Sequence, residues 1–306
     1  MVRVSLAAVS PSPLSRRRFL QLTGAGLLAA QARAEAESPW PVITFSKPFQ
    51  KTTFERTAEI VSEVGWQGIE LPLRANGQIE PERVADDLPK MVEALKKRGL
   101  QVGLITTDIV ATSTPHAEKV LKTAKALGIT RYRMGFIKYR EAQSPSAQLD
   151  GLKPQMRELA AMNREIGVQG GLQNHSGAGY VGCAVWDIFE LVRDLKPAEL
   201  GICFDIGHAT LEGGTSWPVE ARLMEPHFVC VYVKDFAWER GEKGFVSKWG
   251  PLGGGMVHRE FFTWLKKSPY RGPISQHVEY IEGDTPENLA QMKRDYAVLL
   301  DWIRTA

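Results

Sequence analysis

Cysteine is scarce in this chain. Only three cysteines, Cys183, Cys203 and Cys230, occur among 306 residues. An odd and sparse set cannot form a disulfide framework. Cys203 and Cys230 lie within apolar runs typical of strands, where a thiol packs as a small core side chain. The cysteines therefore favour neither redox chemistry nor a cysteine-based zinc site.

Long apolar runs are also missing after the N-terminus. Beyond residue 34, no segment reaches the roughly 18 apolar residues that a transmembrane helix needs. The short apolar run Leu22–Ala30 follows Arg16-Arg17-Arg18-Phe19-Leu20 and precedes Ala32-Arg33-Ala34. This order is typical of a secretory signal, and the paired arginines resemble the twin-arginine motif. We expect cleavage near Ala34 and delivery of residues 35–306 to the periplasm by the twin-arginine export machinery.

An excess of positive charge is absent from the expected mature chain. The sequence has 38 basic and 35 acidic residues, but five arginines and no acidic residue fall within residues 1–34. The remainder would carry 33 basic and 35 acidic residues, a net charge of −2. Such a chain lacks the broad cationic surface that binds phosphate backbones. We therefore expect no nucleic-acid partner and no stable membrane insertion.

From Val42 onward, short apolar runs alternate with segments of helical periodicity, which predicts repeated βα units. The predicted strands are Val42–Ser46, Gly68–Pro72, Val102–Thr106, Arg131–Phe136, Gly170–Asn174, Gly201–Asp205, Val229–Val233 and Ile274–Glu279. The predicted helices are Phe54–Val64, Pro81–Lys97, His116–Leu127, Gln148–Ile166, Val185–Leu195, Val219–Met224, Arg259–Lys267 and Glu287–Ile303.

Eight such units in about 270 residues suit a single-domain α/β protein of the (β/α)8 TIM barrel type. An open doubly wound sheet is the alternative. No Gly-x-Gly-x-x-Gly motif follows the first strand, so the usual dinucleotide-binding reason for that fold is missing.

Polar side chains end several of the predicted strands. Gln173 and His175 end the fifth strand, Asp205 ends the sixth, and His277 and Glu279 end the eighth. Singly, each has a structural explanation, such as a helix cap, a core histidine or a surface ion pair. Buried polar groups are costly without partners, and TIM barrels carry their sites at this end of the strands. Together these residues favour a functional site, to which the nearby His208 would belong.

Other residues near these strand ends could bind substrate oxygens or a sugar ring. Lys47 follows the first strand, and Lys234 lies on the same strand face as Tyr232. Trp238 follows the seventh strand, where an indole could stack on a sugar. Solvated lysines and loop packing are equally good explanations of these three residues.

Several motifs together resemble one family. They are Ile43-Thr44-Phe45-Ser46, Gly68-Ile69-Glu70-Leu71, Phe204-Asp205-Ile206-Gly207-His208, Tyr232-Val233-Lys234-Asp235, Pro251-Leu252-Gly253-Gly254-Gly255 and Pro273-Ile274-Ser275. In order and spacing they resemble the xylose isomerase-like barrels, which include sugar phosphate isomerases and epimerases, hydroxypyruvate isomerases, ketose 3-epimerases and endonuclease IV. An endonuclease would need a richer metal cluster and a basic groove.

The resemblance implies a divalent metal ion. Epimerase-like members hold it with Glu, Asp, His and Glu on strands five to eight, and the matching residues here are Gln173, Asp205, Tyr232 and Glu279. Gln173 brings no charge, and a neutral phenol is a poor ligand. We expect Gln173, Asp205 and Glu279 around the ion. Oxygen donors favour Mg²⁺ or Mn²⁺, while nearby His175 or His208 would suit Zn²⁺ or Co²⁺.

The resemblance also implies proton abstraction next to a carbonyl. Gln173 cannot accept a proton, so Glu279 is the expected base, with the carbonyl polarised by metal or His208. His175 or His277 would return the proton, and His277 is also expected to bind the substrate. Because export favours unphosphorylated substrates, we expect a sugar isomerase or epimerase acting on a keto sugar or derivative. A 3-keto-glycoside lyase and a non-catalytic carbohydrate-binding barrel remain open alternatives.

Overall fold

The computed structural model describes residues 38–242 and 244–306. The predicted export signal, residues 1–34, lies outside the described residues. Within the described residues, no helix is long and apolar enough to cross a membrane.

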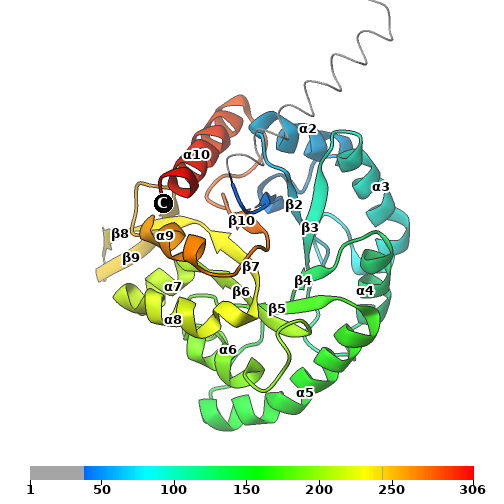
Figure 1. The fold of residues 1–306 in the computed structure, drawn as a ribbon, viewed down its shortest axis with the longest axis vertical. Helices are drawn as coiled ribbons and strands as arrows, with labels where there is room; N and C mark the ends of the chain where they lie inside the picture. The colour runs from blue at the N-terminus through cyan, green and yellow to red at the C-terminus, as the bar shows by residue number, and fades with distance from the viewer. Residues whose placement is uncertain (1–37, 243) are drawn as a thin grey trace, which may run out of the picture.

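Eight parallel strands close into a barrel, which confirms the predicted TIM barrel (Figure 1). They are β1 (Val42–Phe45), β2 (Gly68–Pro72), β3 (Gln101–Thr106), β4 (Arg131–Arg133), β5 (Gln169–Gln173), β6 (Leu200–Asp205), β7 (Phe228–Val233) and β10 (Ile274–Gln276). The order around the barrel is β1-β10-β7-β6-β5-β4-β3-β2. The barrel strands therefore follow one another around the barrel in the order of the sequence, because each crossover leads to the neighbouring strand.

Helices surround the strands (Figure 1). They are α2 (Phe54–Val64), α3 (Val84–Lys96), α4 (Ala117–Ala126), α5 (Pro145–Ile166), α6 (Val185–Val192), α7 (Ile206–Gly213), α8 (Trp217–Met224), α9 (Glu260–Lys267) and α10 (Pro286–Thr305). The ends of α2 show why the sequence folds this way. The Thr53 side chain accepts a hydrogen bond from the backbone of Arg56, and Gly65 closes the helix at φ 104°.

Two elements beyond the predicted ones lie near the carboxyl ends of the strands. The helix α7 begins directly after β6, with Asp205 as its N-cap. An antiparallel hairpin, β8 (Asp235–Gly241) and β9 (Gly244–Gly250), follows β7 and stands outside the ring of strands (Figure 1). The last barrel strand is shorter than predicted, because it ends at Gln276 and leaves His277 and Glu279 on the following loop.

The core has two parts. A large apolar cluster fills the space between the strands and the helices. A small cluster packs inside the barrel and consists of Ile43, Leu104, Cys203, Val229, Cys230 and Tyr232. Cys203 and Cys230 are fully buried free thiols, which confirms their expected place in the core.

Candidate active site

The candidate site lies at the carboxyl ends of the barrel strands, where side chains from β2, β4, β5, β6 and β7 and from the loop after β10 meet. One member is Glu70 of β2, which is fully buried. Its carboxylate accepts hydrogen bonds from Tyr232 Oη at 2.9 Å and Ser275 Oγ at 2.7 Å, and also from Thr106 Oγ1. His277 Nε2 lies 3.0 Å from Glu70 Oε2. Burial would raise the pKa of Glu70, but His277, Arg133 and these hydrogen bonds outweigh it and lower the pKa.

A hydrogen-bond chain connects β4 to β6. Arg133 Nη1 donates to Gln173 Oε1 at 2.8 Å, and Gln173 Nε2 donates to Asp205 Oδ2 at 2.9 Å. A guanidinium only donates and a carboxylate only accepts, so these partners determine which way the amide of Gln173 points. Both ends of the Gln173 amide are therefore engaged.

The two carboxylate oxygens of Asp205 have different roles, one in capping a helix and one in the candidate site. Its Oδ1 accepts from the backbone N–H of His208 and caps α7, while Oδ2 faces the site. The helix-cap role and the site role of Asp205 are both present. Burial would raise the pKa of Asp205, but Lys234 and His208 lower it to about 2.

Lys234 follows β7 and joins two carboxylates. Its Nζ lies 3.1 Å from Asp205 Oδ2 and 3.7 Å from Glu279 Oε2, and 4.7 Å from the centre of the Trp249 ring. Burial would raise the pKa of Glu279, but His277 and the two lysines around it hold the pKa well below its usual value. Glu279 is therefore an ionised carboxylate at neutral pH.

His208 and His175 lie beside this group, with ring centres 4.1 Å apart. His208 Nδ1 accepts from the backbone N–H of Ser176 at 3.1 Å, so neutral His208 carries its proton on Nε2. Among the described residues, Nε2 has no hydrogen-bond partner, and it lies 3.7 Å from Asp205 Oδ2. Burial, followed by the charge of Lys234, lowers the pKa of both histidines.

His175 has the opposite tautomer. Its Nδ1 lies 2.9 Å from the carbonyl oxygen of Ser176, which can only accept, so Nδ1 carries the proton and Nε2 keeps a lone pair. Neutral His208 thus presents an N–H donor, and neutral His175 presents a proton acceptor.

His277 is buried between Glu70 and Glu279. Its Nε2 contacts Glu70, and its Nδ1 lies 3.5 Å from Glu279 Oε2. Burial would lower the pKa of His277, but the two carboxylates raise it. The substrate-binding role expected of His277 stays a prediction; the residue is 4 % exposed and lines a cavity beside Glu279.

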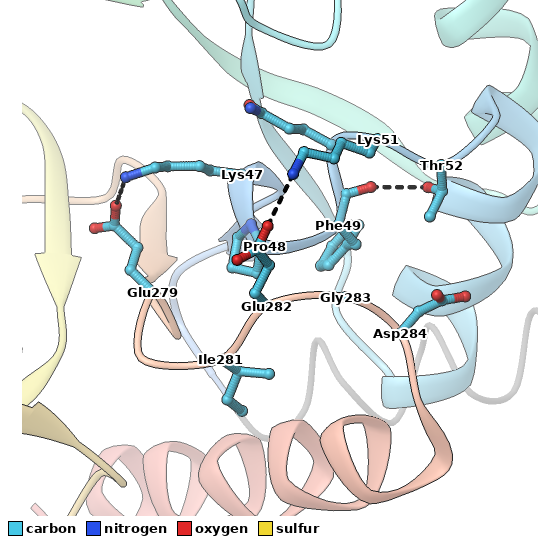
Figure 2. A pocket seen from close by; sticks show the side chains of 11 residues that line it. Lys47, Pro48, Phe49, Lys51, Thr52, Glu279, Ile281, Glu282, Gly283 and Asp284 are labelled. Carbon is cyan, nitrogen blue, oxygen red and sulfur yellow. Dashed lines mark hydrogen bonds and ion pairs between the residues drawn. The ribbon is translucent and has the colours of Figure 1, made fainter.

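Glu279 lines two cavities. One, of about 190 Å³, is lined by His175, Ser176, His208, Lys234, Asp235, Trp249, Gly250, His277, Glu279 and Tyr280. The other, of about 480 Å³, lies between the loops after β1 and β10. Figure 2 shows Lys47 and Glu279 extending toward one another at this cavity, joined by an ion pair of 2.7 Å. A small molecule in either cavity would meet the Glu279 carboxylate.

The structure brings together most of the residues that the sequence indicated. Gln173, Asp205, His208 and Lys234 adjoin one another, and Glu279 joins them through Lys234. Trp238 is different, because it is 45 % exposed on the hairpin and lines neither of these two cavities. Trp249, on β9, is the indole that faces the smaller cavity.

Sequence reasoning missed Glu70 and Arg133 as members of the site. Each is a charged residue within a short strand, and burial of such a residue without partners is costly. A charged residue within a predicted buried strand was therefore the signal in the sequence that pointed to partners, and so to the site. The fourth strand was predicted as Arg131–Phe136 without any role for its side chains, and in the structure it is shorter, Arg131–Arg133.

The residues at the expected metal position do not suit a divalent ion. The carbonyl oxygen of Gln173 already accepts from Arg133. Tyr232 donates its hydroxyl to Glu70, and burial keeps the pKa of that phenol well above its usual value. A cation near Asp205 and Glu279 would also meet the Lys234 ammonium. Over residues 38–242 and 244–306, no group of three or more His, Cys, Asp and Glu side chains is arranged to hold a metal ion.

The residue after Lys234, Asp235, is held by backbone hydrogen bonds. The carboxylate of Asp235 accepts four backbone N–H hydrogen bonds of 2.9 to 3.0 Å, from Phe236, Gly253, Gly255 and Val257. The backbone of the glycine run after β9 therefore binds the Asp235 carboxylate, which is an anion of the protein itself.

The protein is a closed parallel α/β barrel with charged side chains at the carboxyl ends of its strands. This is the end of the barrel at which TIM-barrel enzymes carry their active sites. A model of the family described as Xylose isomerase-like TIM barrel matches residues 58–305, and the chain belongs to this family. Comparison with curated protein sequences found no match.

Solved structures show the same fold at low sequence identity. A Xylose isomerase-like TIM barrel protein from Mycobacterium smegmatis in complex with magnesium is 15 % identical, with a TM-score of 0.65 over 87 % of this chain and 97 % of that one. The 3-keto-D-glucoside 4-epimerase from E. coli is 15 % identical, with a TM-score of 0.64 over 87 % and 100 %. A D-allulose 3-epimerase from Methylomonas sp. in complex with D-allulose is 14 % identical, with a TM-score of 0.64 over 86 % and 97 %.

Proposed function

We propose that the protein is an enzyme that removes a proton next to the carbonyl group of an unphosphorylated keto sugar or keto-glycoside. The observation that carries the proposal is the meeting of Glu279, Lys234, His208 and His175 around one cavity of about 190 Å³ at the carboxyl ends of the strands. The relatives described as a 3-keto-D-glucoside 4-epimerase and a D-allulose 3-epimerase support this substrate class.

Glu279 is the proposed base. It is ionised at neutral pH and lines the cavity, so it can take a proton from a carbon atom next to the carbonyl. Negative charge then develops on the carbonyl oxygen. The Nε2–H of neutral His208 can donate to that oxygen and stabilise the charge.

The fate of the proton decides the product. Return by Glu279 to the former carbonyl carbon, with the hydroxyl proton of the deprotonated carbon passing to the former carbonyl oxygen, gives an isomer. His175 lies on the His208 side of the cavity, and return from its ring after it has been protonated gives an epimer. Loss of a leaving group next to the deprotonated carbon gives elimination, which is the lyase alternative.

Metal assistance, which the family resemblance led us to expect, is not part of this proposal. Gln173 and Tyr232 are engaged with Arg133 and Glu70, and no step above requires a bound ion. A carbohydrate-binding barrel without catalysis is the second candidate. The ion pair of Lys47 with Glu279 favours it, because that pair occupies the proposed base in the present structure.

The decisive experiment uses keto sugars and 3-keto-glycosides in D₂O, with NMR and mass spectrometry to detect product and deuterium next to the carbonyl. Wild-type protein should exchange deuterium into at least one compound, and Glu279→Gln should abolish the exchange with little change in melting temperature. Substitution of the exposed Glu239, which pairs with Lys248 on the hairpin, is the matched control. Exchange that survives Glu279→Gln would contradict the assigned base, and binding without exchange would favour the second candidate.

Export remains part of the proposal. The twin-arginine motif and the Ala32-Arg33-Ala34 site support a periplasmic enzyme. Cell fractionation with the intact leader and with Arg16→Lys/Arg17→Lys would test it, since the variant should stay in the cytoplasm.

A further inference from the structure

Lys234 places a positive charge between the two carboxylates that the family resemblance assigns to a metal ion. Its Nζ is 3.1 Å from Asp205 Oδ2 and 3.7 Å from Glu279 Oε2, and its side chain is 9 % exposed. A divalent ion held by the same two oxygens would lie within about 2.6 Å of each. Two cations so close together repel strongly in a poorly solvated site. The ammonium and a metal ion therefore compete for one position.

The surrounding contacts hold the lysine in this position. The Trp249 ring centre lies 4.7 Å from Nζ, which suits a cation–π contact. Gly207 packs against the stem of Lys234, since a Cβ atom added at Gly207 would lie 2.9 Å from Lys234 Cγ. The backbone beyond Lys234 is secured through the four hydrogen bonds to Asp235. The side chain lies in a formed pocket and is not a solvated lysine.

The charges present at the site also disfavour a divalent ion. A neutral amide, Gln173, stands where the resemblance implies a carboxylate, and it is held by Arg133. An ammonium carries one positive charge where a divalent ion carries two. The Lys234 ammonium and the carboxylates of Asp205 and Glu279 together leave one net negative charge, so part of the negative charge of the pair is already balanced by the protein itself.

We propose that the Lys234 ammonium acts in place of a divalent cation, keeping Asp205 and Glu279 in place and contacting the carbonyl oxygen of the substrate. The first part concerns metal binding alone. The second part rests on the proposed function, because it assigns Lys234 with His208 to the oxygen on which charge develops.

Metal binding tests the first part without any substrate. Protein is treated with EDTA, dialysed and titrated with MnCl₂, and free Mn²⁺ is followed by electron paramagnetic resonance. Wild-type protein should show no saturable site below about 1 mM. The double variant Gln173→Glu/Lys234→Gln, which restores a carboxylate and removes the ammonium, should gain one saturable site.

The control for this titration is Gln169→Glu/Lys248→Gln, which makes the same charge change at the far end of β5 and on the hairpin. It should gain no site. One saturable Mn²⁺ in wild-type protein that is lost in Asp205→Asn would overturn the proposal. If the double variant does not fold by circular dichroism, the wild-type and Asp205→Asn titrations still decide.

Turnover tests the second part. Lys234→Gln should lower kcat by about 10²- to 10³-fold, as expected for removal of one donor to a developing oxyanion, and EDTA should leave the wild-type rate unchanged. Lys248→Gln should behave as wild type. Unchanged kcat in Lys234→Gln, or wild-type activity that EDTA removes and Mn²⁺ restores, would refute the proposal. If no keto sugar is turned over at all, the proposed function fails, whereas the Mn²⁺ titration still decides the role of the lysine.

Discussion

Tyr232 Oη donates a 2.9 Å hydrogen bond to Glu70 Oε1, across the interior of the barrel from β7 to β2. The phenol thereby satisfies a fully buried carboxylate instead of facing the mouth. This contact explains why the hydroxyl of the residue that matches the family's histidine ligand is directed to Glu70, although Tyr232 pairs with Asp205 across β7 and β6. The residue two positions later, Lys234, reaches Asp205 and Glu279 instead.

Tyr232→Phe should destabilise the protein by about 1 to 3 kcal/mol, because a buried carboxylate loses one of its donors. Urea unfolding would measure the change. Tyr180→Phe, at a half-buried loop position, serves as the comparison and should change stability much less. A Tyr232→Phe protein as stable as wild type would show that the other contacts of Glu70 suffice.

Asp205→Asn should reduce the dependence of stability on acid. The folded pKa of Asp205 is lowered to about 2 from an ordinary value of 3.8, so its ionised form stabilises the fold above pH 3.8. That stabilisation, on the order of 2 kcal/mol, is lost as the pH falls through about 2.

Unfolding free energies of wild type and Asp205→Asn should therefore differ most at neutral pH and converge between pH 4 and about 2. The exposed Asp301, which pairs with Arg304, provides the control substitution Asp301→Asn. A constant difference between wild type and Asp205→Asn across this range would contradict the assignment.

Gly207→Ala should displace Lys234 and Trp249. The new Cβ would lie 2.8 Å from the Lys234 carbonyl oxygen and 3.1 Å from Trp249 Cζ3, and such overpacking costs about 1 to 3 kcal/mol. Gly151→Ala is the matched control. Nothing lies within 4 Å of a Cβ at Gly151 in α5, so this change should stabilise the helix by about 0.5 to 1 kcal/mol. Equal melting temperatures for the two variants would show that the site accommodates the methyl group.

His208→Ala should lower kcat by about 10²- to 10³-fold and change KM little, because its N–H donor acts on charge that develops in the transition state. His258→Ala, at an exposed position beside Glu260, should leave both constants unchanged. A large rise in KM with kcat preserved would instead give His208 a purely substrate-binding role.

The sequence predicted the barrel well because its signals are local. Most of the barrel strands are short apolar runs, and Gly65 and Gly167 end helices in the left-handed conformation. The convergence of Gln173, Asp205 and Glu279 also followed, since parallel strands bring their carboxyl ends together.

The rest depends on contacts between distant segments. Glu70 and Tyr232 are 162 positions apart, and neither carries a local sign of the other. The hairpin was missed because β8 and β9 pair only with one another and so lack the burial pattern of the barrel strands. The position of the Lys234 ammonium likewise depends on contacts with Asp205, Glu279 and Trp249, which come together only in the folded protein.

The four hydrogen bonds around Asp235 have a thermodynamic consequence for its neighbour. A lysine side chain normally loses much of its rotational freedom when it binds a ligand, and this loss of entropy weakens binding. Here the backbone at the start of the hairpin is immobilised during folding, and indole and glycine confine the stem above it. The entropic cost of ordering the ammonium is therefore part of the free energy of folding, and it does not recur each time a sugar binds.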